Sequence, residues 1–452
     1  MLRHLAISCL VAALALTGFS TIAAARTRPR YGGTLRVETS VDPWQRPNGL
    51  ARRLVLDGLT SLDPDGTVRP ALATDWESEN ANHRWQFHLR PGVHFHDGSP
   101  LTTIAVVASL NAACPSNCPW TTIHATGSAV IFTADGPTPN LPALLAGDDF
   151  LIALTISSDG KTPNGATGTG PFQVNGFNNG VLSLIANDTC WQGRPFVDSI
   201  EIRTRRSTSD QWLDLTAGRA DVVEVPAEET RPARQQHLVI IASQPVELLA
   251  LQISDSGPLA NSNLRAAIAQ AIDRNSLANV IFQKEGQVTA GLLPQSLSGY
   301  SFLFPGERDL AKAQQLRGGI TPPPLSLRIE SDSAMQLVGQ RIALNLREAG
   351  FNAQINAPTS QRPDLALRRI SIQTAEPAAV IEQILRAQDH PAPIDADPTA
   401  EYKAEREFLD RRTLVPLLYL PRAYALSPRV RDLQLRSDGS PDLADASLEA
   451  AP

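Results

Sequence analysis

The sequence is poor in cysteine, methionine and lysine. Among its 452 residues are four cysteines and two methionines, and only four of its 40 basic residues are lysines. Hydrophobic residues make up 42% and charged residues 19%, which excludes both a disordered chain and a bundle of membrane helices. The formal net charge of −6 excludes a nucleic-acid-binding protein that depends on bulk positive charge.

Long uncharged apolar runs are also scarce. The one such run, residues 5–19, is shorter than the roughly 20 residues that a membrane-spanning helix needs. Arg3 precedes it, and the small residues Ala23 and Ala25 follow it, which is the pattern of a cleavable export signal. We therefore expect residues 1–25 to be a signal peptide and the mature protein to be periplasmic.

Three cysteines lie beyond this signal. Cys114 and Cys118 stand four residues apart, and an oxidising compartment permits a disulfide between them that would leave Cys190 free. A metal site is the alternative, but it needs further ligands nearby, and the closest histidine is His124. We expect the short disulfide loop and no metal.

The spacing of apolar residues predicts a β-rich first half and a second half that contains a βαβ unit. In that unit, 325–329 predicts a strand, helical spacing over 338–346 predicts a helix, and 351–355 predicts a second strand. Segment 356–399 has no clear pattern, and the acidic end, 437–452, is expected to fray. Further strands are predicted at 34–39, 85–90, 171–177, 181–186, 198–204 and 414–420, and further helices at 103–113, 207–217, 264–272 and, capped by Asn275, 276–283.

No local motif predicts catalysis or a cofactor. The histidines of His94-Phe95-His96 could chelate a metal, but the following Asp97-Gly98 indicates a tight turn that buries Phe95. Gly168-Thr169-Gly170 resembles a phosphate loop, yet it lacks the Lys-Ser/Thr ending and precedes a strand, which favours a crossing or hinge turn. Nucleophile-elbow, zinc-protease and Cys–His signatures are missing. We expect no catalytic residues and no cofactor.

Several segments, in order along the chain, resemble the family-5 extracellular solute-binding proteins. These proteins are the dipeptide, oligopeptide and nickel receptors of ABC importers. Each segment alone is a weak signal, and their shared order makes the resemblance specific. The segments are Gly32–Val37, Leu56–Gly66, Arg69–Trp76, Trp85–Pro100, Thr169–Phe172, Trp191–Pro195, Ala217–Val223 and Asn263–Arg274.

The resemblance implies a mixed α/β protein with a two-lobe, periplasmic-binding-protein-like fold and an inserted β-rich subdomain. Lobe I would comprise residues 31–246 together with 415–452, and the subdomain would occupy about 51–167 within it. Lobe II would span 247–414. The chain would border the cleft between the lobes near 249–252.

From chain position we name Trp44, Trp120, Thr169 and Gln252 as candidate ligand-binding residues. Each tryptophan is either a cleft residue or part of a hydrophobic core. Thr169 and Gln252 stand where the resemblance places the chain beside the cleft. An extended ligand could also pair its main chain with a strand edge near Glu38–Thr39.

One segment departs from the family pattern. Peptide-binding relatives carry a Trp and an Asp in their second half, and that Asp holds the amino terminus of the peptide. Residues 365–385 contain neither and offer Arg368, Arg369 and Glu376 instead, and Cys190 stands where a Tyr is usual. An amine clamp of that kind is therefore not expected here.

The resemblance implies an exported receptor that captures a small, peptide-like ligand and delivers it to the permease of an ABC importer. We expect it to act as a monomer, to bind no nucleic acid and to meet the membrane only through the permease. The first alternative is a metal or metal-chelate receptor that uses His94, His96 or His124. The others are a degenerate interaction protein that no longer serves transport, and an exported hydrolase.

Overall fold

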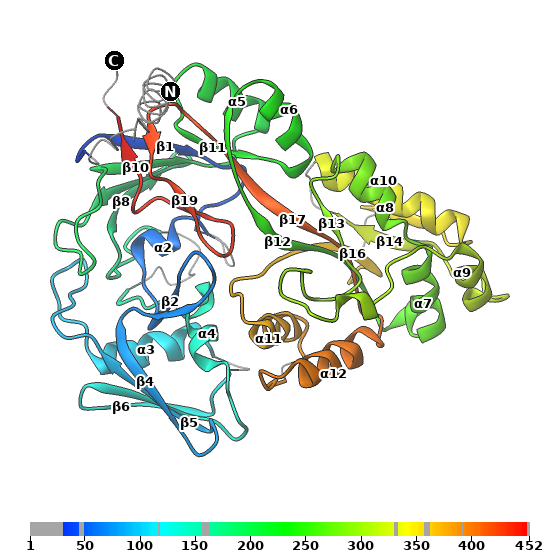
Figure 1. The fold of residues 1–452 in the computed structure, drawn as a ribbon, viewed down its shortest axis with the longest axis horizontal. Helices are drawn as coiled ribbons and strands as arrows, with labels where there is room; N and C mark the ends of the chain where they lie inside the picture. The colour runs from blue at the N-terminus through cyan, green and yellow to red at the C-terminus, as the bar shows by residue number, and fades with distance from the viewer. Residues whose placement is uncertain are drawn as a thin grey trace, which may run out of the picture.

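The computed structural model describes residues 30–44, 49–115, 118–155, 163–329, 333–356, 362–390 and 392–449. The expected signal peptide, residues 1–25, lies outside the described residues. Figure 1 shows two lobes joined by two long strands, β12 (Val239–Ile253) and β17 (Leu414–Leu426). The mixed α/β, two-lobe fold expected from the sequence is confirmed. The residue numbers at which we divide the lobes stay a prediction.

One sheet runs through both lobes. Its order is β15-β14-β16-β12-β17-β11-β1-β10-β9-β8, and β13 pairs with β17 beside this path. The first lobe supplies β1 (Thr34–Glu38), β8 (Phe172–Asn178), β9 (Val181–Ala186), β10 (Ser199–Arg203) and β11 (Val222–Val225). The second lobe supplies β13 (Gln287–Val288), β14 (Leu325–Arg328), β15 (Ala353–Ile355) and β16 (Leu365–Ser371).

The pairing of β12 with β17 marks the passage between the lobes. These antiparallel strands pair from Val239 opposite Leu426 to Gln252 opposite Leu414, with register shifts between Ala242 and Glu247. On one side of the shifts β17 also pairs with β11, and on the other side β12 pairs with β16. A bulge adds local twist, so the shifts let one sheet change direction between the lobes.

A β-rich subdomain is attached to the first lobe. Its antiparallel sheet has the order β4-β5-β7-β6, and the side chains of Trp85, Phe87 and Phe132 fill its core. A disulfide joins Cys114 to Cys118 directly after the helix of this subdomain, α3 (Thr103–Ala113), which confirms the expected pairing. Cys190 is free and buried. The elements are β2 (Thr60–Leu62), β3 (Val68–Pro70), β4 (Ala73–Glu79), β5 (Arg84–Leu89), α3 (Thr103–Ala113), β6 (Thr122–Thr126), β7 (Ala129–Thr133) and α4 (Leu141–Leu145).

The sheet of the second lobe is covered by helices on both faces. The βαβ unit predicted from the sequence is confirmed, because β14 and β15 are parallel and α10 (Ser333–Glu348) connects them. Leu249 and Leu251 face the core under α10 and α7 (Ser262–Ala271), whereas Leu248 and Ala250 face α11 (Pro377–Ala387) and α12 (Pro398–Leu409). The side chains of β12 therefore alternate between two hydrophobic cores.

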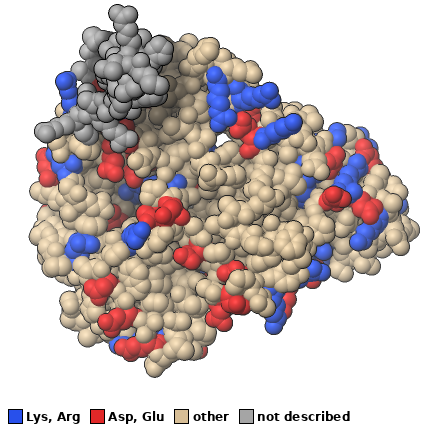
Figure 2. All heavy atoms as spheres, in the orientation of Figure 1, with Lys and Arg blue, Asp and Glu red and all other residues tan. Residues whose placement is uncertain are grey.

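The remaining helices and strands are short. On the face drawn in Figure 2, basic and acidic side chains are interspersed over both lobes. No helix in the described part of the chain is both long and apolar enough to span a membrane. The short elements are α2 (Arg52–Val55), α5 (Thr208–Thr216), α6 (Thr230–Gln235), α8 (Arg274–Ser276), α9 (Leu310–Arg317), β18 (Val430–Arg431), β19 (Gln434–Leu435), β20 (Pro441–Asp442) and β21 (Ser447–Leu448).

Two expectations about local structure are wrong. The helix expected at 276–283 starts earlier, at α8, where Asp273 rather than Asn275 accepts the capping hydrogen bond, and it continues as a π-turn over Leu277–Ile281. The acidic end does not fray over its described part. Leu443 and Ala446 are fully buried there in the core of the first lobe.

Glu405 is an acidic residue in the core of the second lobe. It lies on α12 with 1% of its surface exposed, and the main-chain N–H of Leu292 donates a hydrogen bond to its Oε1. Burial raises the pKa of Glu405 from its ordinary value of 4.5 to about 7, despite that hydrogen bond. The folded protein therefore holds this proton more tightly than the unfolded chain does.

This pKa predicts that the stability of the protein falls as the pH rises from about 4.5 to about 7. The contribution is fully present below the unfolded pKa and is lost as the pH passes the folded pKa. Relative to the variant Glu405→Gln, the wild type should lose roughly 3 kcal/mol of unfolding free energy between pH 4.5 and pH 8. Urea denaturation followed by circular dichroism measures the difference. The variant of the exposed neighbour, Glu407→Gln, keeps Glu405 and should therefore show the same pH dependence as the wild type. Equal slopes for all three proteins would contradict the prediction.

Candidate ligand-binding site between the lobes

The two lobes touch where the β-rich subdomain faces α11. The amide of Asn140 donates hydrogen bonds to Glu382 Oε1 at 3.0 Å and to the carbonyl oxygen of Ile394 at 2.9 Å. The main-chain N–H of Asp148 donates to the side-chain oxygen of Gln373 at 3.3 Å. These polar groups are buried, so the contacts seal one side of the space between the lobes.

Gly66 contributes the tightest of these approaches. A Cβ atom at this position would lie 2.4 Å from the Cβ of Ala375, across the junction between the lobes. Gly66 also has a φ of +84°, in the left-handed region that favours glycine. The segment Pro64-Asp65-Gly66 thus forms a turn and, because Gly66 has no side chain, a flat contact surface for the second lobe.

Five charged residues lie together where both lobes and the joining strands meet, and we refer to them as the inter-lobe cluster: Arg53, Asp148, Glu247, Arg422 and Asp438. Arg53 pairs with Asp148 at 2.5 Å within the first lobe. Arg422 Nε lies 3.6 Å from Glu247 Oε2 on the joining strands. Asp438 lies within the electrostatic reach of both arginines. The cluster thus presents charges of both signs, two of them on the buried side chains of Asp148 and Asp438, to anything held between the lobes.

Asp438 stays ionised although it is buried. Burial alone would raise its pKa, but the positive charges of Arg53 and Arg422 and the hydrogen bonds from Ser440 outweigh burial and hold the pKa below its ordinary value. The hydroxyl of Ser440 donates to Asp438 Oδ1 at 2.5 Å and the N–H of Ser440 donates to it at 2.9 Å. The cluster therefore includes a permanent negative charge at neutral pH.

The C-terminal hairpin formed by β19 and β20 brings Asp438 to this position. Figure 1 shows the hairpin between the two lobes. Gly439, with a φ of +76°, packs against Val246 and Ser243 of β12. The hydroxyl of Ser437 donates a hydrogen bond to the carbonyl oxygen of Gln373 at 3.2 Å. The turn thus contacts the first lobe, a joining strand and the second lobe together.

The two tryptophans named from the sequence lie in cores of the first lobe and its subdomain. Trp44 is 1% exposed, and the guanidinium of Arg52 lies 5.4 Å from its ring centroid. Trp120 is packed edge-on against Phe132, with ring centroids 5.1 Å apart. These positions agree with the core alternative that we considered for both residues. Their role in ligand binding stays a prediction.

Thr169 is buried where residues 168–170 cross residues 54–57, and we refer to this place as the crossing. Its hydroxyl donates a hydrogen bond to Asp57 Oδ2 at 2.7 Å, and the indole N–H of Trp191 donates to the same oxygen at 2.9 Å. Burial raises the pKa of Asp57 in spite of these two donors. Thr169 thus has a structural partner, and its role toward a ligand also stays a prediction.

His96 uses both ring nitrogens to hold the same crossing. Its Nε2 lies 3.0 Å from the carbonyl oxygen of Gly170, and its Nδ1 lies 3.3 Å from the main-chain nitrogen of Gly168. His94 instead contacts the carbonyl oxygen of Gly92 in its own turn. Within the described ranges, no group of three or more His, Cys, Asp or Glu side chains is arranged to hold a metal ion.

The expected strand edge near Glu38–Thr39 does not exist. β1 lies between β10 and β11, so Glu38 pairs with Arg203 on one side and with Val223 on the other. The N–H of Thr39 donates to the carbonyl oxygen of Arg203. A ligand cannot add a strand at this place, because main-chain partners already occupy both sides.

Gln252 lies far from the inter-lobe cluster. It is five residues beyond Glu247, the cluster member on β12, or about 17 Å along an extended strand. It lines a pocket of about 470 Å³ whose walls come from the second lobe alone. Leu249–Leu251, which are expected to border the cleft, are buried in the cores of the second lobe, and their position beside the cleft stays a prediction. The role of Gln252 in ligand binding stays a prediction.

The crossing at Gly168 predicts a sharp difference between two glycine substitutions. A Cβ atom at Gly168 would lie 2.1 Å from the carbonyl oxygen of Val55, whereas one at Gly136 would meet nothing within 4 Å. Gly168→Ala should therefore lower the free energy of unfolding by roughly 1–3 kcal/mol, and Gly136→Ala should leave it nearly unchanged. Urea denaturation of both variants measures this, and equal stabilities would refute the assigned packing.

Comparison with known proteins places this fold in a family. The family model described as "Bacterial extracellular solute-binding proteins, family 5 Middle" matches residues 67–390. The Bacillus subtilis protein YhjP is 30% identical over 253 residues, which are 53% of this chain and 41% of YhjP. The probable D,D-dipeptide-binding periplasmic protein DdpA of Escherichia coli is 24% identical over 284 residues, 58% of this chain and 54% of DdpA. The chain thus spans about half of the length of these relatives.

Solved structures share the two-lobe fold. The binding protein DppA of Helicobacter pylori, in complex with the peptide STSA, has a TM-score of 0.77 at 20% identity and covers 93% of this chain and 99% of its own. AgaA of A. tumefaciens, in complex with agropinic acid, has a TM-score of 0.80 at 20% identity with the same coverage. These likenesses concern the fold. Together with the match over residues 67–390, they establish that the chain belongs to the family 5 bacterial extracellular solute-binding proteins.

Proposed function

We propose that the protein is the exported substrate-binding receptor of an ABC importer and that it captures a small, peptide-like ligand between its lobes. The inter-lobe cluster carries this proposal, because it gathers buried and half-buried charges of both signs where the two lobes and their joining strands meet. A short peptide carries one charge of each sign at its ends. The names of two relatives, D,D-dipeptide-binding for DdpA and glutathione-binding for GsiB of Salmonella typhi, support this ligand class.

The charges suggest how a peptide would be held. Its carboxylate would lie against Arg53 and Arg422, whose guanidinium groups match carboxylate geometry. Its ammonium group would lie against Asp438 or Glu247. Buried ion pairs gain little net free energy, so exchanging internal pairs for ligand pairs costs little. An uncharged analogue would leave the internal ion pairs of the cluster in place and would gain no ionic contact of its own, and this difference would provide the selectivity.

The lobes would close around the ligand by bending at β12 and β17. A ligand shifts this equilibrium only by binding the closed form more tightly than the open form. The contacts of Asn140 and Gln373 across the junction belong to the closed form, so they would contribute to ligand affinity from a distance. The permease of the importer would then recognise the closed shape. We propose that the receptor acts as a monomer in the periplasm and leaves the ligand chemically unchanged.

The ligand class can be tested with matched peptides. Native mass spectrometry of protein purified from its own host would first identify a co-purified small molecule. Calorimetry should then detect binding of a di- or tripeptide, and a capped peptide that is N-acetylated and C-amidated should bind at least about tenfold more weakly, since each end loses an ionic partner. Equal affinities would contradict the proposed role of the cluster. Binding of nickel or a nickel chelate in place of every peptide would favour the alternative metal receptor.

Closure can be tested away from the ligand. Asn140→Ala removes two hydrogen bonds that form only when the lobes touch, so it should weaken peptide binding by roughly three- to tenfold and make the peptide-bound protein larger in small-angle scattering. Gln315→Ala, on the exposed side of α9, serves as the matched control and should change neither quantity. Unchanged affinity for Asn140→Ala would show that this junction does not contribute to closure.

A further inference from the structure

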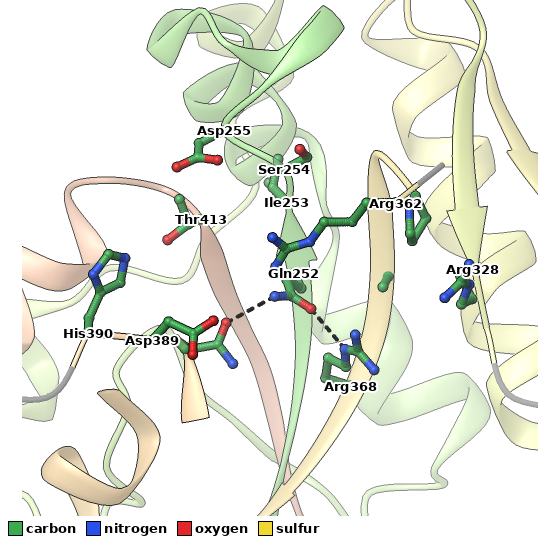
Figure 3. A pocket seen from close by; sticks show the side chains of 13 residues that line it. Gln252, Ile253, Ser254, Asp255, Arg328, Arg362, Arg368, Asp389, His390 and Thr413 are labelled. Atoms are coloured by element: carbon green, nitrogen blue, oxygen red, sulfur yellow. Dashed lines mark hydrogen bonds between the residues drawn. The ribbon is translucent and has the colours of Figure 1, made fainter. Parts of the chain in front are cut away.

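The second lobe contains a pocket that is separate from the space between the lobes. It lies where β12 ends, β16 begins and α11 ends, and its volume is about 470 Å³. Figure 3 shows Gln252 at its centre, where the side-chain amide donates to Gln388 at 3.2 Å and the side-chain oxygen accepts from Arg368 at 2.9 Å. All of its lining residues come from the second lobe, so a ligand in it would not need the lobes to close.

One wall of the pocket is basic. Arg328 at the end of β14, Arg362 before β16 and Arg368 on β16 all line it, and Figure 3 shows Arg362 reaching over Gln252. Among the described residues, none of these three arginines forms an ion pair with a carboxylate. Arg369, the next residue on the same strand, does pair with Glu247, at 3.5 Å. The arginine side chains in the pocket are thus available to an external anion.

The opposite wall is acidic. Asp255, which follows β12, and Asp389, which follows α11, line the pocket on the other side of Gln252 from Arg328 and Arg368 in Figure 3. Neither carboxylate forms an ion pair within the described part of the chain. Thr413, between them, has a buried hydroxyl oxygen without a hydrogen-bond partner among the described residues. Opposite charges therefore face each other across the cavity without meeting.

We propose that this pocket binds a small zwitterion, with its carboxylate on the arginine wall and its ammonium group on the aspartate wall. An ω-amino acid, with charges at the two ends of a short chain, has this form. A ligand with anionic groups alone would bring negative charge against Asp255 and Asp389. A ligand with a cationic group alone would make no ionic contact with the arginine wall. This site goes beyond the proposed peptide receptor, because it involves neither the inter-lobe cluster nor closure.

The experiment uses three probes of matched length: 5-aminopentanoate, pentanoate and pentylamine. Calorimetry on the full-length protein should show that 5-aminopentanoate binds at least about tenfold more tightly than either singly charged probe, since each wall adds a charge-assisted contact. The double variant Arg362→Gln/Arg368→Gln should reduce its affinity to about that of pentylamine. Asp255→Asn/Asp389→Asn should reduce it to about that of pentanoate, and asparagine tolerates the φ of +58° at position 389.

Arg347→Gln provides the matched control, because it removes an exposed arginine from α10 outside the pocket, and it should leave the affinity unchanged. Circular dichroism verifies that each double variant is folded. The proposal is overturned if the wild type does not bind 5-aminopentanoate at millimolar concentration, if pentanoate binds equally well, or if the variants of the two walls bind like the wild type. Small-angle scattering with and without the probe should be identical, and compaction would place the probe between the lobes instead.

Discussion

The antiparallel pairing of β12 with β17 is the interaction on which the rest of this structure depends. The two strands stay hydrogen-bonded from Val239 to Gln252, so a single sheet supports both lobes while its register shifts between Ala242 and Glu247 let the lobes face each other. Val246 lies in the core beside these shifts, and Glu247 belongs to the inter-lobe cluster. The same few residues thus position a hydrophobic core, a change in sheet direction and the charges proposed to hold a ligand.

The charges of the inter-lobe cluster come from different parts of the chain. Arg53 and Asp148 come from the first lobe and its subdomain, Glu247 and Arg422 from the joining strands, and Asp438 from the C-terminal hairpin. Burial of a charge alone would be unfavourable, and each of these charges lies near a partner of opposite sign. Charges gathered between two lobes are suited to a charged ligand held there. This arrangement agrees with membership of a solute-binding family.

Much of the fold could be predicted from local patterns. The βαβ unit around α10, the alternation of β5 and the capped helix α3 all match, because burial of one face leaves a clear period in the sequence. α11 was missed because it lies within segment 356–399, where prolines interrupt the apolar pattern on both sides of the helix. The described part of the C-terminal segment was expected to fray because it is acidic and short of large apolar residues, yet Leu443 and Ala446 anchor it.

The sequence by itself determined the class of protein: a two-lobe member of a solute-binding family, with ordered family segments and a disulfide at Cys114 and Cys118. Only the tertiary structure decided which polar side chains meet. Trp44 and Trp120 turned inward because aromatic surface gains most from full burial, whereas Gln252, near the end of the joining strand β12, lines a charged pocket of the second lobe. The inter-lobe cluster joins residues nearly 400 positions apart, and no local spacing records such a meeting, because chain folding alone brings them together.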